Sequence, residues 1–286
     1  MRNRKTLSLS LKLVFGLCTV VFAQFNLAAQ ELYVFSEPAS NMPARSLSFK
    51  YEGKFLEGYH SNSLEQRHSL ETRIGLSKKW MLDFGATMSD MYSDRMRFES
   101  VNFYTKYRFY SNDQVHRHFR AAAFVEGSWS RNNPFYDEIA FDGDQSGIRG
   151  GVIFTQLLHK LALSSTLSLS EVLHETRFEK NAGPELYPWR AFNYSLSAGY
   201  LLFPRNYNGF NQTNFNLYVE LMGSNALDKS LNYVDLAPAI QFIFNSNTKL
   251  NAGYRFQLNG NMHRMARQSW LLSFETTFLN AFKKKS

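Results

Sequence analysis

The chain has 286 residues, a formal net charge of +8 and an aromatic content of 16%. Only seven residues are proline, and Phe is abundant, which excludes a disordered linker protein and favours β-strands. The modest surplus of charge comes with no recognisable nucleic-acid-binding motif, so binding to nucleic acid is not expected.

The first residues have the pattern of a secretory signal peptide. The basic stretch MRNRKTLSLSLK precedes the apolar run LVFGLCTVVFA, and small residues follow. We expect residues 1–29 to be removed, with cleavage after Ala23 or Ala29, and the run is too short to span a bilayer as a helix. Cys18 lies in the middle of this run behind Leu17, which disfavours a lipoprotein. The remaining chain then contains no cysteine, and its formal charge falls to +4.

Alternating apolar and polar residues predict strands along the rest of the chain. In LNAGYRFQL, for example, Leu250, Tyr254 and Leu258 share one face of an extended strand, while Arg255 lies on the other. Irregularities such as Pro238 leave ten to fourteen strands possible, and twelve fit best. The twelve predicted strands span residues 45–58, 68–77, 80–91, 98–111, 116–130, 147–158, 161–175, 191–203, 213–224, 231–244, 250–259 and 269–278.

The connections between these strands decide what the apolar faces contact. Long and short connections alternate along the chain, with one exception at the eighth. Outer-membrane barrels have short periplasmic turns and longer external loops, whereas a soluble sandwich has no reason for this alternation. We therefore expect an all-β protein, an antiparallel transmembrane β-barrel with both termini periplasmic, in the outer membrane of a Gram-negative bacterium. Residues 30–43 form an N-terminal periplasmic segment or plug, 44–282 the barrel and 283–286 a basic tail.

The polar faces of the predicted strands carry many ionisable side chains. A wet or salt-bridged lumen accepts such groups, while a soluble core would not. In this set the basic groups outnumber the acidic ones, which favours anionic or polar solutes. The predicted lumen-facing charges are Lys50, Glu52, Lys54, Glu71, Arg73, Asp83, Lys106, Arg108, Arg120, Glu126, Arg149, Glu220, Arg255 and Glu275. The predicted membrane-interface aromatics are Trp80, Phe109, Tyr110, Trp129, Trp270 and Phe278.

The opening ELYVFSEPASNMPARSLSFKYEG, together with the signal peptide and the strand run, resembles outer-membrane β-barrel proteins. The phrase SEPASNMPARS is similar to the mature start of a Bacteroidota group of outer-membrane transporter proteins, which is broadly similar to the phenol-degradation MetA-like barrels. The resemblance implies location and architecture but no substrate. Such barrels generally end on an aromatic residue, for which Phe278 or Phe282 is available, although KKKS follows.

Two other sites have weaker support from the sequence. His60, Ser61 and Asn62 resemble the base, nucleophile and orienting groups of barrel-rim lipid hydrolases, with His68 and Ser69 nearby, but the spacing does not match. Asp137, Glu138, Asp142 and Asp144 form an acidic loop that lacks the full spacing of a calcium loop. His116 and His118 share a strand face without a third metal ligand.

The best interpretation is a passive channel or transporter for small polar, anionic or aromatic solutes, with no cofactor. Its partners are then outer-membrane lipids, the barrel-assembly machinery and the solute. The alternatives are a rim lipid hydrolase, a structural barrel with a closed lumen and a soluble periplasmic β protein.

Overall fold

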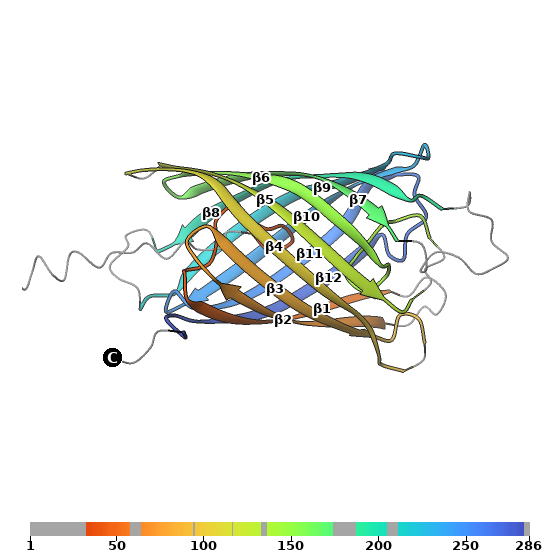
Figure 1. Ribbon diagram of the computed structural model, residues 1–286, viewed down its shortest axis with the longest axis horizontal. Helices are drawn as coiled ribbons and strands as arrows, with labels where there is room; N and C mark the ends of the chain where they lie inside the picture. Colours follow the sequence, from red (N-terminus) through yellow and green to blue (C-terminus); the bar gives the residue numbers. More distant parts are fainter. Residues whose placement is uncertain are drawn as a thin grey trace, which may run out of the picture.

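The protein forms a closed barrel of twelve antiparallel strands (Figure 1). The computed structural model describes residues 33–57, 64–93, 95–115, 117–132, 136–173, 187–204 and 211–282. Each strand pairs with its neighbours in the chain, and β1 pairs with β12 to close the sheet. The strands are β1 (Ser46–Glu57), β2 (Leu64–Gly75), β3 (Trp80–Ser89), β4 (Arg97–Gln114), β5 (Arg117–Ser130), β6 (Gly147–Leu158), β7 (Leu161–Val172), β8 (Arg190–Phe203), β9 (Asn214–Ala226), β10 (Asn232–Phe244), β11 (Thr248–Gly260) and β12 (Gln268–Phe278).

The predicted strand number and the antiparallel closed barrel are confirmed. The boundaries differ by a few residues, most at β2, which begins four residues before the predicted start at His68. The ladder between β10 and β11 has a register shift at Val234/Asp235, and no residue pairs there with Pro238. On its other edge Pro238 stays in register opposite Val219 of β9, so the proline disturbs only one side of its strand.

The outer surface of the barrel is apolar along most of its length. In β12, for example, Trp270, Leu272 and Phe274 are each about half exposed, while the intervening Ser273 and Glu275 are buried. Because side chains of a strand alternate between two faces, the same pattern repeats around the sheet. Soluble monomers rarely expose contiguous apolar surface of this extent, and a membrane barrel faces lipid with it. Among the described residues, no helix has the length and apolarity needed to cross a bilayer.

Both ends of the strand sequence lie at one rim. Leu47 at the start of β1 pairs with Phe278 at the end of β12, and Ser46 pairs with Gly75. The turn that follows Gly75 is short, and so is the turn between Leu158 and Leu161. The longer connections 131–146 and 261–267 lie at the opposite rim, which we call the loop rim.

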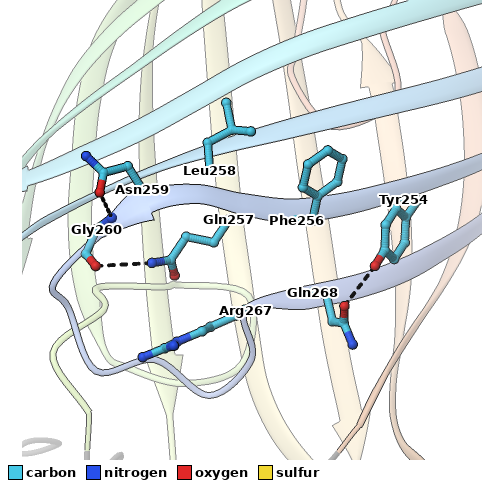
Figure 2. Close-up of a pocket in the computed structure, with 8 residues that line it drawn as sticks. All are labelled: Tyr254, Phe256, Gln257, Leu258, Asn259, Gly260, Arg267 and Gln268. Carbon is cyan, nitrogen blue, oxygen red and sulfur yellow. Dashed lines mark hydrogen bonds between the residues drawn. The ribbon is translucent and has the colours of Figure 1, made fainter.

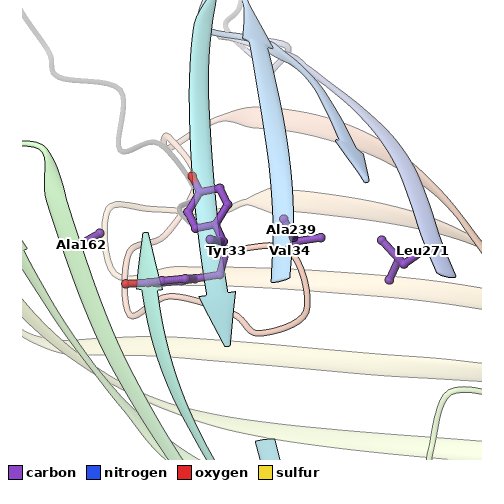
Figure 3. Packing of buried hydrophobic residues seen from close by; sticks show 6 residues of the cluster. Tyr33, Val34, Ala162, Ala239 and Leu271 are labelled. Carbon is purple, nitrogen blue, oxygen red and sulfur yellow. The ribbon is translucent and has the colours of Figure 1, made fainter. Parts of the chain in front are cut away.

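Residues 33–43 run inside the barrel before the chain enters β1. Tyr33 and Val34 are buried against Ala239 of β10 and Leu271 of β12 (Figure 3). Further along, Ala39 is buried against a second cluster on the inner wall that includes Phe124 and Ile153. The segment is therefore packed against the inner wall at two places. Residues 1–32, which include the predicted signal peptide, and the tail 283–286 lie outside the described residues.

Candidate functional site

A polar chamber of about 320 Å³ lies inside the barrel. Two chain segments border it. We call residues 33–43 the inner segment and residues 136–146 the inward loop. The inner segment borders the chamber with residues 33–37, and the inward loop borders it with residues 138–142. The remaining walls come from strands around the barrel. The chamber is thus enclosed by these two non-strand segments as well as by the barrel wall.

The inner segment is held by one of its own carboxylates. Glu37 Oε1 lies 2.8 Å from the Arg73 guanidinium of β2, and Glu37 Oε2 lies 3.4 Å from Lys106 Nζ of β4. The Lys106 ammonium is fully buried and also donates a hydrogen bond to the Pro38 carbonyl at 2.7 Å. Because an unpaired buried ammonium is costly, Lys106 and the inner segment stabilise each other.

A carboxylate of the barrel wall accepts hydrogen bonds from backbone amides of the same segment. The amides of Val34 and Phe35 each donate to Glu220 Oε1 at 2.9 Å, and Ser197 donates to Glu220 Oε2 at 3.1 Å. Glu220 is completely buried on β9. These three donors meet the hydrogen-bonding needs of a charge that would otherwise be expensive to bury.

The inward loop is tied to β2 and β4. Arg67 bonds with Asp144 of the loop, and its Nε donates to Glu99 Oε2 of β4 at 2.8 Å. The Asn132 amide donates to Glu99 Oε1 and to the Gly143 carbonyl. All of these groups are buried, so the contacts form a closed polar network that places the loop inside the mouth of the barrel.

A second set of contacts ties the loop to the β11–β12 connection, which lies opposite the loop's own strands β5 and β6 in the strand order. Arg264, in the connection before β12, donates to Glu138 at 2.9 Å and to both oxygens of Asp235. The Asp137 amide also donates a hydrogen bond to the His263 carbonyl at 2.9 Å. The loop therefore reaches from β5 and β6 across to β2 and the β11–β12 connection.

The electrostatics at Glu138 are set by its two arginine neighbours. Burial by itself raises the pKa of a carboxylic acid by desolvation. Here the adjacent guanidinium groups of Arg264 and Arg255 outweigh burial and lower the pKa of Glu138 to about 2. The carboxylate is consequently ionised at any physiological pH, and the contact with Arg264 remains charged.

Ten of the fourteen predicted lumen charges line the chamber, so the polar faces of several strands converge on it. These ten are Lys50, Glu52, Lys54, Glu71, Arg73, Asp83, Glu126, Arg149, Arg255 and Glu275. Lys106 and Glu220 contact the inner segment instead, and Arg120 donates to Ser40 Oγ of that segment at 2.9 Å. Arg108 is half-buried on β4 and is not among the lining residues.

The chamber also contains charged residues that the sequence analysis did not place in the lumen. Arg67, Lys249, Glu37, Glu138 and Asp142 also line it, so seven cationic and eight acidic residues face each other there. The excess of basic groups expected from the sequence is therefore balanced inside the chamber. Arg67 was detectable, because it shares the inward face of β2 with Glu71 and Arg73. Glu37, Glu138 and Asp142 lie outside the strands, where alternation carries no signal.

The other half of the chamber wall is neutral. Thr166 and Ser168 of β7, Asn193 and Ser195 of β8 and Tyr194 line it with hydroxyl and amide groups. The Thr166 hydroxyl is buried and has no hydrogen-bond partner among the described residues. The chamber is thus charged on one side and neutral but polar on the other.

The predicted interface aromatics are exposed on the outer surface. Trp80 begins β3, Trp129 lies one residue before the end of β5 and Phe278 ends β12. Trp270 lies near the start of β12. Phe109 and Tyr110 are consecutive yet both exposed, because the β4–β5 ladder shifts register between Arg108 and Tyr110.

The acidic loop residues do not converge. Asp137, Glu138 and Asp144 are engaged by His263, Arg264 and Arg67 as described above, and Asp142 is exposed. Over the described ranges, no three His, Cys, Asp or Glu side chains are grouped as metal ligands. Two of the four carboxylates, Glu138 and Asp144, instead bind arginines.

The suggested hydrolase residues His60, Ser61 and Asn62 lie outside the described residues, as does His116. Of their neighbours, His68 stacks on Tyr51, and its Nδ1 shares a 2.6 Å hydrogen bond with the Tyr51 hydroxyl. Ser69 lines the chamber. His68 and Ser69 thus lie on opposite faces of β2 and cannot act on each other. His118 pairs with Asp113 at 2.9 Å.

A separate depression of about 550 Å³ lies at the end of the β11–β12 ladder (Figure 2). The last pair of that ladder is Phe256 with Gln268, beyond which the two strands part. Tyr254 donates to Gln268 across the strands at 2.8 Å. The lining residues are Tyr254, Phe256, Gln257, Leu258, Asn259, Gly260, Arg267 and Gln268, and none of them lines the chamber.

Comparison with known proteins places this architecture among outer-membrane barrels. No protein-family description and no curated protein sequence matches the chain. Among solved structures, an outer membrane channel from Pseudomonas putida F1 is similar with a TM-score of 0.58 at 10% identity, over 86% of this chain and 100% of that chain. The NanC porin is similar with a TM-score of 0.50 at 11% identity, over 80% of this chain and 98% of that chain. At these identities the similarity concerns the fold: a closed, twelve-stranded, porin-like barrel.

Proposed function

We propose that this protein is a porin-like channel of a Gram-negative outer membrane that admits small polar solutes passively. The observation that carries the proposal is the polar chamber inside a barrel whose outer surface is apolar. The two similar structures are a channel and a porin by name, which supports the same interpretation. Insertion would proceed through the barrel-assembly machinery, as in other outer-membrane barrels.

The inner segment and the inward loop act, in this proposal, as the two barriers to passage. Both are held only by ion pairs, hydrogen bonds and small apolar clusters, so each can move without breaking the barrel ladder. Residues 33–43 would then be the plug and residues 136–146 the constriction at the loop rim. Because the chamber charges nearly balance, we expect weak discrimination between small anions and cations.

Single-channel recording in planar bilayers tests the proposal. The full-length mature chain should give small conductance steps, and a variant lacking residues 33–43 should give steps that are several-fold larger, because the barrel begins only at Ser46. Folding of both proteins is checked by the gel mobility shift between heated and unheated samples. If neither correctly folded protein gives reproducible steps, the barrel is sealed and the channel proposal is wrong.

A further inference from the structure

Among the described residues, two charged groups of the chamber stand outside its network of ion pairs. Of the charged residues that line it, Lys54 on β1 and Asp142 on the inward loop form no ion pair or hydrogen bond within the described residues. The other thirteen are all engaged, for example Lys50 with Glu52 at 2.9 Å and Lys249 with Glu275 at 3.3 Å. The pairing in this chamber is therefore nearly complete, with one exception of each sign.

The carboxylates of Glu138 and Asp142 are among the electrostatic neighbours of Lys54, but within the described residues Lys54 forms an ion pair with neither. Its strongest electrostatic neighbours are the cations Arg255 and Arg67. Both guanidinium groups are directed to other carboxylates, Arg255 to Asp235 at 2.6 Å and Arg67 to Glu99 at 2.8 Å. The ammonium of Lys54 thus adds a positive charge to a region where the neighbouring charges are already compensated.

Asp142 presents the opposite case. It is exposed, whereas Phe141 and Gly143 on either side of it are buried. Asp142 interacts electrostatically with Arg149 and with Lys54, but it forms an ion pair with neither, and Arg149 pairs with Glu126. The inward loop therefore holds one free carboxylate at the chamber, where it faces the same space as Lys54.

We infer that the chamber is a binding site for a small zwitterion of the amino-acid type, with Lys54 contacting its carboxylate and Asp142 its ammonium group. A volume of about 320 Å³ lies at the lower end of the range for small-ligand sites. The hydroxyl and amide groups of β7 and β8 offer hydrogen bonds to the rest of the solute. This inference rests on the proposed channel function and specifies its substrate class.

Four three-carbon solutes of similar size provide the test: alanine as zwitterion, lactate as anion, alaninol as cation and propane-1,2-diol as neutral compound. Influx of each into proteoliposomes is measured at equal concentration. The wild type should admit alanine faster than the other three by roughly two- to fivefold, which is the effect expected of one or two partly solvated ion pairs.

Substitutions should change this order in a predictable direction. K54M leaves only the carboxylate and should favour alaninol, whereas D142N leaves only the ammonium and should favour lactate. The double variant should admit all four solutes at similar rates. The matched control is R190M/E171Q, which removes one charge of each sign from an exposed ion pair outside the chamber and should keep the alanine preference.

Three outcomes are distinguishable. If alanine enters no faster than propane-1,2-diol, or if K54M and D142N leave the order unchanged, the zwitterion site is wrong while the channel stands. If none of the four solutes enters through correctly folded protein, the channel proposal itself fails.

Discussion

Four carboxylates hold the inner segment and the inward loop inside this barrel. Glu37 binds Arg73 and Lys106, and Glu220 receives two backbone amides of the inner segment. On the inward loop, Asp144 forms an ion pair with Arg67, and Glu138 forms one with Arg264. Both segments also pack apolar side chains against the wall, and these carboxylates add to the free energy that holds each segment in the lumen.

Replacement of Glu37 by Gln should loosen the inner segment. The amide oxygen can still accept a hydrogen bond, but the charge that faces Arg73 and Lys106 is lost, at a cost of about 1–2 kcal/mol for this partly exposed pair. Single-channel recordings should then show open events roughly 5- to 30-fold more frequent than in wild type. E57Q, at the exposed end of β1, should have no effect. An unchanged opening frequency in E37Q would mean that the segment is not a barrier.

The response to pH should reflect the lowered pKa of Glu138. A carboxylate with a pKa of about 2 in the folded protein and an ordinary pKa near 4.5 otherwise stabilises the loop above about pH 4.5. That stabilisation is lost as the pH falls from about 4.5 towards 2. Conductance should therefore stay constant between pH 8 and 5 and rise only in more acidic solution. In E138Q the loop should already be loosened at pH 7, and the acid-induced rise should be absent or much reduced.

At the scale of elements, the inward loop depends on one glycine. Gly143 has a φ of 121°, which L-residues with a side chain rarely adopt. A Cβ atom there would lie 2.7 Å from Glu99 Oε2 and 2.9 Å from the Arg67 guanidinium, so it would press into the network that holds the loop. The absence of a side chain at Gly143 thus leaves room for the ion pair between Arg67 and Glu99.

We expect G143A to displace the inward loop and widen the loop-rim entrance. The strained backbone and the clash should cost about 1–3 kcal/mol, taken from the loop contacts rather than from the barrel ladder. Single-channel conductance should increase while the heat-dependent gel shift stays normal. G127A in β5 is the control, because a Cβ atom at Gly127 meets no atom within 4 Å. Equal conductance in G143A and G127A would show that the loop does not restrict passage.

For the whole molecule, stability depends on the apolar outer surface facing hydrocarbon. Leu272 lies in the middle of β12 and is 50% exposed, and Gln268 lies on the same face at the strand end. L272R should destabilise the folded barrel by about 2–4 kcal/mol, whereas Q268R near the interface should cost about 0–1 kcal/mol. Urea unfolding in lipid vesicles measures both values. Similar values for the two variants would contradict the placement of this face in lipid.

The barrel itself was largely predictable from the sequence. Alternation is a local property with a period of two, so it identified twelve strands and their two faces without any knowledge of the partners. It failed where the chain leaves the strands or where a ladder shifts. Arg67 was left out of the predicted lumen charges because it precedes the predicted start of the strand at His68. The register shift in β4 turns both Phe109 and Tyr110 outward, as expected for interface aromatics but not from alternation alone.

The sequence by itself determined the β architecture, the strand number and the division into an apolar and a polar face, because each of these is encoded in neighbouring residues. Only the tertiary structure decided what fills the lumen. Glu220 meets Val34 across 186 residues, and Arg264 meets Glu138 across 126. Contacts over such separations arise from closure of the sheet and from the inward path of two segments, and no local pattern specifies either. The balance of charge in the chamber, and the two groups left unpaired there, follow from those contacts.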